Sequence, residues 1–147
     1  MRSIWIALIG PTVSGAENLL ADSGFVHCEE TNNWNYPSGE SAVLFVSCGD
    51  MSWVEKYQLQ EEWEELLDAM QGEEPTVMVN VHVSGRVPGD DEVQFLAKLM
   101  LGSFKGAAFD DYFSYTHAWS LPEIQEGTLV DGLHFFDYRG WNNRNCQ

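Results

Sequence analysis

Four histidines are the residues of this chain best suited to acid–base or metal chemistry: His27, His82, His117 and His134. Imidazole exchanges protons near neutral pH and is a common metal ligand. However, no two of them stand in H-x-H or H-x-x-x-H spacing, and none belongs to a metalloprotease signature. Each has apolar or aromatic neighbours in a segment predicted to be a strand. We therefore interpret them as structural or surface residues, and predict that none is essential.

The other reactive groups do not form a catalytic constellation either. Asp110 and Asp111 in "FDDYF" are adjacent, and adjacent strand residues point to opposite faces of a sheet. A couple between His117 and Asp111 would need contact between residues well separated along one strand. Ser14 lacks the G-x-S-x-G elbow of serine hydrolases. The chain is predicted to be neither an enzyme nor a binder of metals or cofactors.

The three cysteines, Cys28, Cys48 and Cys146, are odd in number and lack C-x-x-C spacing. This predicts reduced thiols in a cytoplasmic protein, without disulfides or a zinc site. The first residues only faintly resemble a signal peptide, because the apolar run from Ile4 to Ile9 is short. No apolar stretch reaches the roughly 20 residues of a membrane span.

Charge is the unusual bulk property. The 147 residues include 23 Asp and Glu against 7 Lys and Arg, for a net charge of −16 and a pI near 4.3. Such a chain repels nucleic acids and anionic membranes and attracts basic proteins. A hydrophobic content of 44% predicts a globular chain, with residues 1–147 forming one domain. Acidity for solubility, or for a high-salt cytoplasm, is the alternative explanation.

The densest acidic stretch is "LQEEWEELLDAMQGEE", residues 59–74, which contains no Lys or Arg. In a helix stopped by Gly72, Trp63 and Met70 lie on one apolar face and the carboxylates occupy the opposite face. Carboxylates one turn apart, as at positions 61 and 65, repel each other by roughly 0.2–0.5 kcal/mol per pair. Solvent-exposed helix faces ordinarily carry both acidic and basic residues, so this wholly acidic face is a candidate site for partner binding. Its members are Glu61, Glu62, Glu64, Glu65 and Asp68.

Two further stretches are candidates for partner binding. One is an acidic loop, made of Asp90, Asp91 and Glu92. The other is the polar segment 32–41, predicted to be a loop, in which Trp34 and Tyr36 stand among Asn and Ser as in many binding surfaces. Trp141 lies in a similar polar tail. Equally, each of these tryptophans could fold back onto the domain.

The first half of the chain predicts the element order βαββαβ. Its strands cover residues 3–9, 25–31, 42–48 and 76–83, and its helices cover 16–24 and 53–71. In the last strand, alternate valines at 77, 79, 81 and 83 share one face. This order matches the ferredoxin-like unit, whose first and third strands lie inside an antiparallel sheet. The first and third strands here are the most uniformly apolar.

The second half predicts a C-terminal αβαβ extension: a helix over 91–104, a strand over 107–119, a helix over 120–125 and a strand over 132–138. Ser120 and Glu123 have the spacing of a capping box. The predicted fold class is therefore α+β, an antiparallel sheet with helices largely on one face.

A small, acidic α+β chain without catalytic motifs resembles the immunity proteins that bacteria pair with polymorphic or contact-dependent toxins. The resemblance implies a cytoplasmic inhibitor that binds a cognate toxin domain, often a cationic nuclease. Three other classes stay open. The chain could be a ferredoxin-like ligand-sensing or regulatory domain with a pocket along Tyr112–Trp119, a nucleic-acid mimic, or an enzyme that uses the scattered His and Asp residues.

Overall fold

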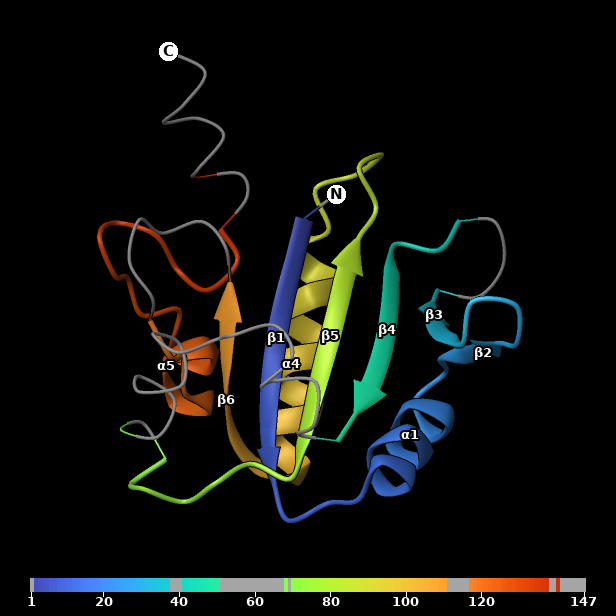
Figure 1. Ribbon diagram of the computed structural model, residues 1–147. Coiled ribbons are helices and arrows are strands. Elements are labelled where there is room, and N and C mark those ends of the chain that lie inside the picture. Colours follow the sequence, from blue (N-terminus) through green and yellow to red (C-terminus); the bar gives the residue numbers. More distant parts are fainter. Residues whose placement is uncertain are drawn as a thin grey trace.

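The computed structural model describes residues 2–37, 41–50, 68, 70–110, 117–137 and 140. In chain order, its elements are β1 (Arg2–Ile9), α1 (Val13–Asp22), β2 (Val26–Cys28), β3 (Asn33–Tyr36), β4 (Leu44–Gly49), β5 (Val77–Val83), α4 (Asp90–Ser103), β6 (Lys105–Asp110) and α5 (Leu121–Glu126). The six strands form one antiparallel sheet in the order β2-β3-β4-β5-β1-β6 (Figure 1). An α+β fold with an antiparallel sheet is thereby confirmed.

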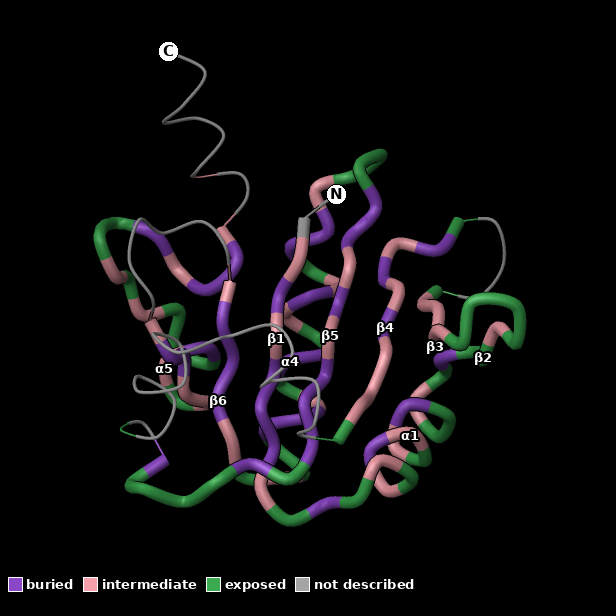
Figure 2. The backbone as a smooth tube through the Cα atoms, in the orientation of Figure 1, coloured by how far each residue is buried: buried purple, intermediate pink, exposed green. Residues whose placement is uncertain are grey.

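The centre of the sheet is β5, which pairs with β4 on one side and β1 on the other. Its alternate valines, 77, 79, 81 and 83, are completely buried on one face, as their spacing predicts. Aliphatic side chains of β1 and β4 extend this layer, and burial is densest along the middle strands (Figure 2). The hydrophobic core therefore follows the period-two pattern of the sequence.

The sheet does not have the predicted ferredoxin-like order. That order places strands 3–9 and 42–48 side by side, whereas β5 lies between β1 and β4. Both strands still have interior positions, as predicted. An apolar pattern shows that a strand is buried but not which strand lies beside it, and β5 is as apolar on its core face as the two strands that it separates.

The prediction of a loop over 32–41 is wrong for Asn33–Tyr36, which form β3. β3 pairs with β2 and with β4. Trp34 and Tyr36 pack against the core, while Asn33 and Asn35 alternate to the other side. Asn and Pro are typical of turns, so their presence in and beside this strand made its alternation of aromatic and polar residues hard to recognise in the sequence. The strand predicted over 25–31 is correspondingly shorter, because β2 ends at Cys28.

The strand predicted over 107–119 is confirmed for 107–110 but is wrong at its other end, because β6 ends at Asp110 and Trp119 lies antiparallel beside Ala108. Trp119 pairs with Ala108 through two backbone hydrogen bonds, with N···O distances of 2.9 and 2.7 Å. Residues 132–137 form turns rather than the predicted strand. Phe135 and Phe136 are both buried, and Phe136 has a φ of 49°. A strand would expose one of two adjacent phenylalanines, whereas the turn buries both.

The three described helices pack on one face of the sheet, as predicted. Leu20 of α1, Leu96 of α4 and Ile124 of α5 all join the same core cluster, and α4 runs behind the strands in Figure 1. The capping box of α5 is present: Ser120 and Glu123 each bond the other's backbone N–H. The helical spacing of the apolar residues in α4 predicts five inward side chains. Val93, Leu96 and Met100 are buried, and Leu99 and Phe104 are partly buried against the same core.

The helix predicted over 53–71 lies almost wholly outside the described residues. Met70, predicted on its core face, is buried, and Gly72, predicted to stop it, has a left-handed φ of 82°. Among the helices that the structure describes, none is both long enough and apolar enough to cross a membrane.

Candidate interaction surface

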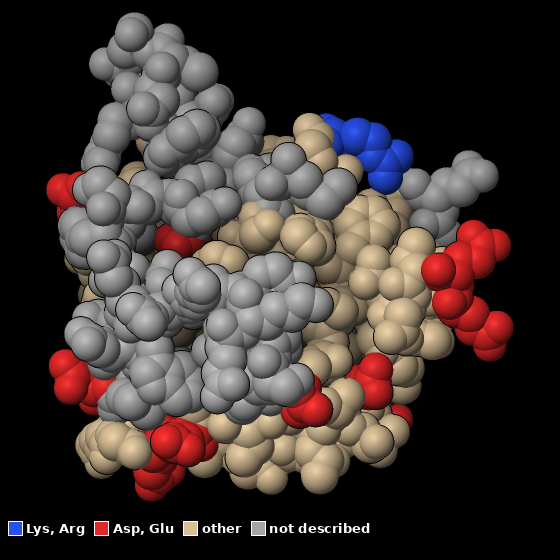
Figure 3. Space-filling model, viewed as in Figure 1, with Lys and Arg blue, Asp and Glu red and all other residues tan. Residues whose placement is uncertain are grey.

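The described surface carries far more acidic than basic side chains. Three exposed residues are basic: Arg86, Lys98 and Lys105. Ten exposed residues are acidic: Asp22, Glu29, Glu30, Asp50, Asp68, Glu73, Glu74, Asp91, Glu126 and Asp131. Figure 3 shows acidic side chains in several places around one face and basic ones in a single place. Three cations cannot neutralise ten carboxylates, so this surface attracts basic molecules.

Of the predicted acidic helix face, only Asp68 is described, and it is exposed. Glu61, Glu62, Glu64 and Glu65 lie outside the described residues. Just beyond, Glu73 is ion-paired with Lys105 at 3.1 Å, and both side chains are about half exposed. Such a pair contributes little to stability, because solvent screens it and two long side chains must be ordered.

The second acidic stretch begins α4 rather than lying in a loop. Asp90, Asp91 and Glu92 occupy the first turn of this helix, where its macrodipole favours negative charge. Asp90 is only 5% exposed, Glu92 is half-buried and Asp91 is exposed. Asp91 is therefore the member of this group that is best placed to meet a partner.

Trp34 is half-buried and tied to the domain. Its indole Nε1–H donates a hydrogen bond to Glu17 Oε2 at 3.0 Å, and its ring lies 5.0 Å from that of His27. The neighbouring Tyr36 stacks on Phe25, with ring centroids 4.7 Å apart. These aromatic residues fasten β3 to α1 and β2. Trp141 lies outside the described residues.

Sequence reasoning missed a groove of about 620 Å³ between α4 and α5. It is lined by Asp91, Gln94, Phe95, Lys98, Ile124, Gln125, Glu126, Gly127 and His134. The available signal was Phe95, an aromatic residue on the otherwise polar side of an amphipathic helix. The alternative pocket along Tyr112–Trp119 falls largely outside the described residues, and Trp119 is fully buried.

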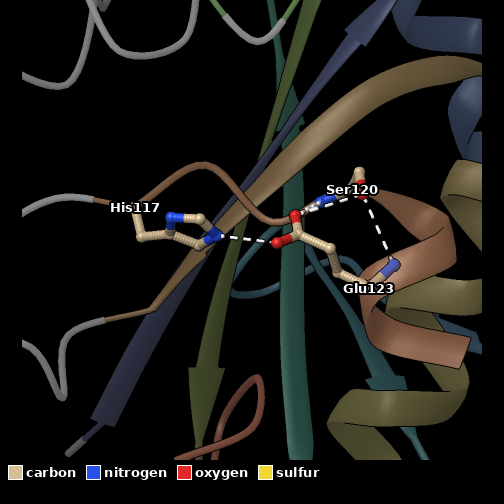
Figure 4. Close-up of polar contacts among 3 residues, drawn as sticks. All are labelled: His117, Ser120 and Glu123. Carbon is tan, nitrogen blue, oxygen red and sulfur yellow. Dashed lines mark hydrogen bonds and ion pairs between the residues drawn. The ribbon is translucent and has the colours of Figure 1, made fainter. Parts of the chain in front are cut away.

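His117 belongs to a small polar cluster that sequence reasoning did not find (Figure 4). Its Nε2 lies 3.1 Å from Glu123 Oε2, and the other carboxylate oxygen accepts bonds from the Ser120 backbone N–H at 2.9 Å and hydroxyl at 3.1 Å. The carboxylate thus stands between the serine and the imidazole. A hydrolase needs its nucleophile bonded to the base, so this order does not activate Ser120. Asp111, considered as a partner for His117, lies outside the described residues.

The other histidines also have local partners. His82 Nδ1 lies 3.1 Å from the Ser3 hydroxyl across the β1–β5 pair, and His27 Nε2 lies 2.9 Å from Asn32 Oδ1. His134 Nδ1 lies 3.0 Å from the carbonyl oxygen of Phe135. Within the described ranges, no group of three or more His, Cys, Asp or Glu residues could hold a metal ion.

The two described cysteines differ in reactivity. A hydrogen bond from the Thr31 side chain, aided by one from its backbone, lowers the pKa of the half-buried Cys28. Burial raises the pKa of Cys48 to about 12, so this thiol stays protonated throughout the neutral range. Because the thiolate is the nucleophile, Cys28 is the more reactive thiol.

We expect iodoacetamide at neutral pH to modify Cys28 at least about tenfold faster than Cys48. The measurement is peptide mass spectrometry over time in a Cys146→Ser background, which removes the cysteine outside the described residues. The ratio should fall towards one in denaturant, where both thiols lose their surroundings. Equal rates in the folded protein would contradict the assignment.

Comparisons of the chain with protein-family models, with curated proteins and with solved structures give no match. Its function must therefore be inferred from its own residues.

Proposed function

We propose that this chain is an acidic binding protein that neutralises a basic protein partner, in the manner of a bacterial immunity protein bound to its toxin. The observation that supports this most directly is the excess of exposed carboxylates over exposed Lys and Arg in the described surface. Nucleic acids and anionic membranes would be repelled by the same charge.

The charge favours fast association. A surface with one dominant sign draws an oppositely charged partner from a distance, and this steering weakens as salt screens it. Salt of about 0.15 M limits exposed-charge interactions to roughly 8 Å, so carboxylates in contact with the partner retain more of their effect than distant ones. The identity of the contacting carboxylates is therefore open to test by substitution.

One experiment tests the proposal directly. The C-terminal domain encoded by the adjacent upstream reading frame is expressed in a bacterium, alone and together with this chain. We expect growth arrest with the domain alone and rescue by the chain, accompanied by a stable complex in size-exclusion chromatography. A harmless neighbour, or arrest without rescue, would refute the immunity proposal.

The acidic face centred on residues 61–68 should carry much of the affinity. Substituting Glu61→Gln, Glu65→Gln and Asp68→Asn removes three charges, and we expect at least about tenfold weaker binding, which corresponds to ~1.4 kcal/mol. The free variant should gain roughly 0.5–1 kcal/mol of stability, because the predicted helix places like charges one turn apart and the substitutions remove them. Calorimetric binding and urea unfolding measure the two effects.

The matched control is Asp22→Asn with Glu29→Gln and Glu30→Gln, three exposed carboxylates at the end of α1 and in the turn after β2. It makes the same change in net charge, so any loss caused by net charge alone is equal in both variants. We expect the control to weaken binding by less than about threefold. Equal losses in both variants, or an affinity that is constant from about 50 to about 500 mM salt, would mean that the predicted face is not the interface.

A further inference from the structure

The groove between α4 and α5 has two dissimilar walls. Asp91, Gln94, Phe95 and Lys98 recur at three- and four-residue spacing, so they share one side of α4. The facing wall consists of Ile124–Gly127, at the end of α5, together with His134. The groove has a volume of about 620 Å³ and is largely open to solvent, so it can hold one long side chain of a partner rather than enclose a small ligand.

Phe95 supplies an exposed ring that is already held in place. It is 39% exposed, yet it stacks on Tyr36 with ring centroids 5.3 Å apart and on Phe25 at 6.5 Å. Phe25 is itself buried, so the stack continues into the core. An anchored ring loses little conformational freedom when a partner docks. The face of such a ring attracts cations within about 6 Å.

Carboxylates accompany the ring. Asp91 lies one helical turn before Phe95, about 6 Å along the axis at ~1.5 Å per residue, and is exposed. Glu126 is exposed on the facing wall. A planar guanidinium can lie on an aromatic face while it donates hydrogen bonds to a carboxylate beside it, and an ammonium is less suited to both at once.

Two further lining residues, Lys98 and His134, affect which ligand the groove accepts. Lys98 lies about 10 Å from Asp91 along the same helix side, so one end of this wall is negative and the other positive. His134 has its Nδ1 next to the Phe135 carbonyl oxygen and its Nε2 3.3 Å from Asp137 Oδ1. Both of its nitrogens are thus occupied by neighbours in the same turn.

We infer that this groove anchors a single arginine side chain of the basic partner, with its guanidinium on Phe95 and beside Asp91. This inference rests on the proposed function and names a contact point for it. Lys98, one turn beyond Phe95, repels any cation at its end of the wall, so the groove takes one arginine placed towards Asp91 rather than a run of basic residues. Arginine anchors in pockets of this kind often dominate interface energies.

The test uses two peptides, acetyl-Gly-Arg-Gly-amide and its citrulline counterpart, which keeps the shape of arginine but has no charge. Each is titrated into the ¹⁵N-labelled full chain, and backbone amide shifts are followed by NMR. We expect saturable shifts centred on residues 91–98 and 124–127 with the arginine peptide, and at least about fivefold weaker binding of the citrulline peptide.

Two substitutions should move the affinity in opposite directions. Phe95→Leu keeps an apolar side chain but removes the ring, and should weaken arginine binding about two- to fivefold. Lys98→Gln removes the repelling charge and should strengthen it about twofold or more. The control, Glu29→Gln, replaces an exposed carboxylate that does not line the groove, and should change the affinity by less than about 1.5-fold.

The outcomes separate the groove from the wider proposal. If the arginine peptide shifts acidic residues over the whole surface and Phe95→Leu has no effect, the groove is not an anchor, although the chain still binds basic molecules. Equal binding of the citrulline peptide would also overturn the inference, because it would show a site for neutral ligands. If the chain rescues growth from a toxin domain, but that domain binds the Phe95→Leu and wild-type chains equally, only the groove assignment fails.

Discussion

Replacing Gly106 with alanine is expected to lower the free energy of unfolding by at least about 2–3 kcal/mol. Gly106 lies in β6 opposite Leu8 of β1, and a Cβ atom added there would stand only 1.9 Å from the carbonyl oxygen of Ala7. That neighbour is backbone, so it cannot rotate away as a side chain would. The two strands would have to separate, with loss of their hydrogen bonds. Urea unfolding monitored by tryptophan fluorescence measures the change.

Gly102→Ala is the matched control. Gly102 lies in the last turns of α4, and a Cβ there would have no atom within 4 Å. Alanine favours helix over glycine by up to about 1 kcal/mol, so this variant should be as stable as the parent or more stable. The same substitution at two positions four residues apart should thus change the free energy of unfolding in opposite directions. A stable Gly106→Ala variant would show that β1 and β6 do not approach as closely as described.

Leu96→Ala should have the second large effect, a loss of about 2–5 kcal/mol. Leu96 is completely buried in α4, where it belongs to the core shared by the helices and the sheet. Truncation removes apolar contacts and leaves a cavity that rigid strands cannot fill. Because Leu96 follows Phe95, the variant should also loosen the wall of the α4–α5 groove. Thermal and urea unfolding test the first effect, and arginine-peptide titration the second.

Lys98→Gln, two residues further along α4, serves as the control for stability. Its side chain is exposed, and a surface substitution of this kind should stay within about 0.5 kcal/mol of the parent. If Leu96→Ala and Lys98→Gln had similar stabilities, the side of α4 assigned to the core would be wrong.

The features predictable from the sequence were those encoded by local patterns. The valine alternation of β5, the capping box of Ser120 and Glu123, and the inward positions of α4 each depend on residues close together in the chain. These signals are strong because side-chain direction follows directly from the strand or helix period. They predicted the α+β class and the interior positions of β1 and β4.

The features missed depend on contacts between distant residues. β3 was obscured by its Asn and Pro neighbours, and only its pairing with β4 makes Asn33–Tyr36 a strand. The turn at 132–137 is held to β6 by the Phe136 N–H, which donates to Asp110 Oδ2 at 2.7 Å, and to α4 by a hydrogen bond from Gln94 to the Phe135 carbonyl. The groove likewise arises where α4 meets α5. Such contacts produce no periodic pattern of apolar residues within one segment, so they cannot be predicted from the sequence of that segment.

The sheet order also determines when the sheet can form while the chain is being synthesised. β1 is made first, yet Ile4 pairs with Val81 of β5 on one side and with Asp110 of β6 on the other. An apolar strand therefore leaves the ribosome long before either neighbour exists. Contacts between such distant residues slow folding, and exposed strand edges promote aggregation in the meantime. A nascent chain whose synthesis stops before β5 leaves β1 without either neighbour, and should need chaperones to stay soluble. A chain that includes β6 can pair both edges of β1.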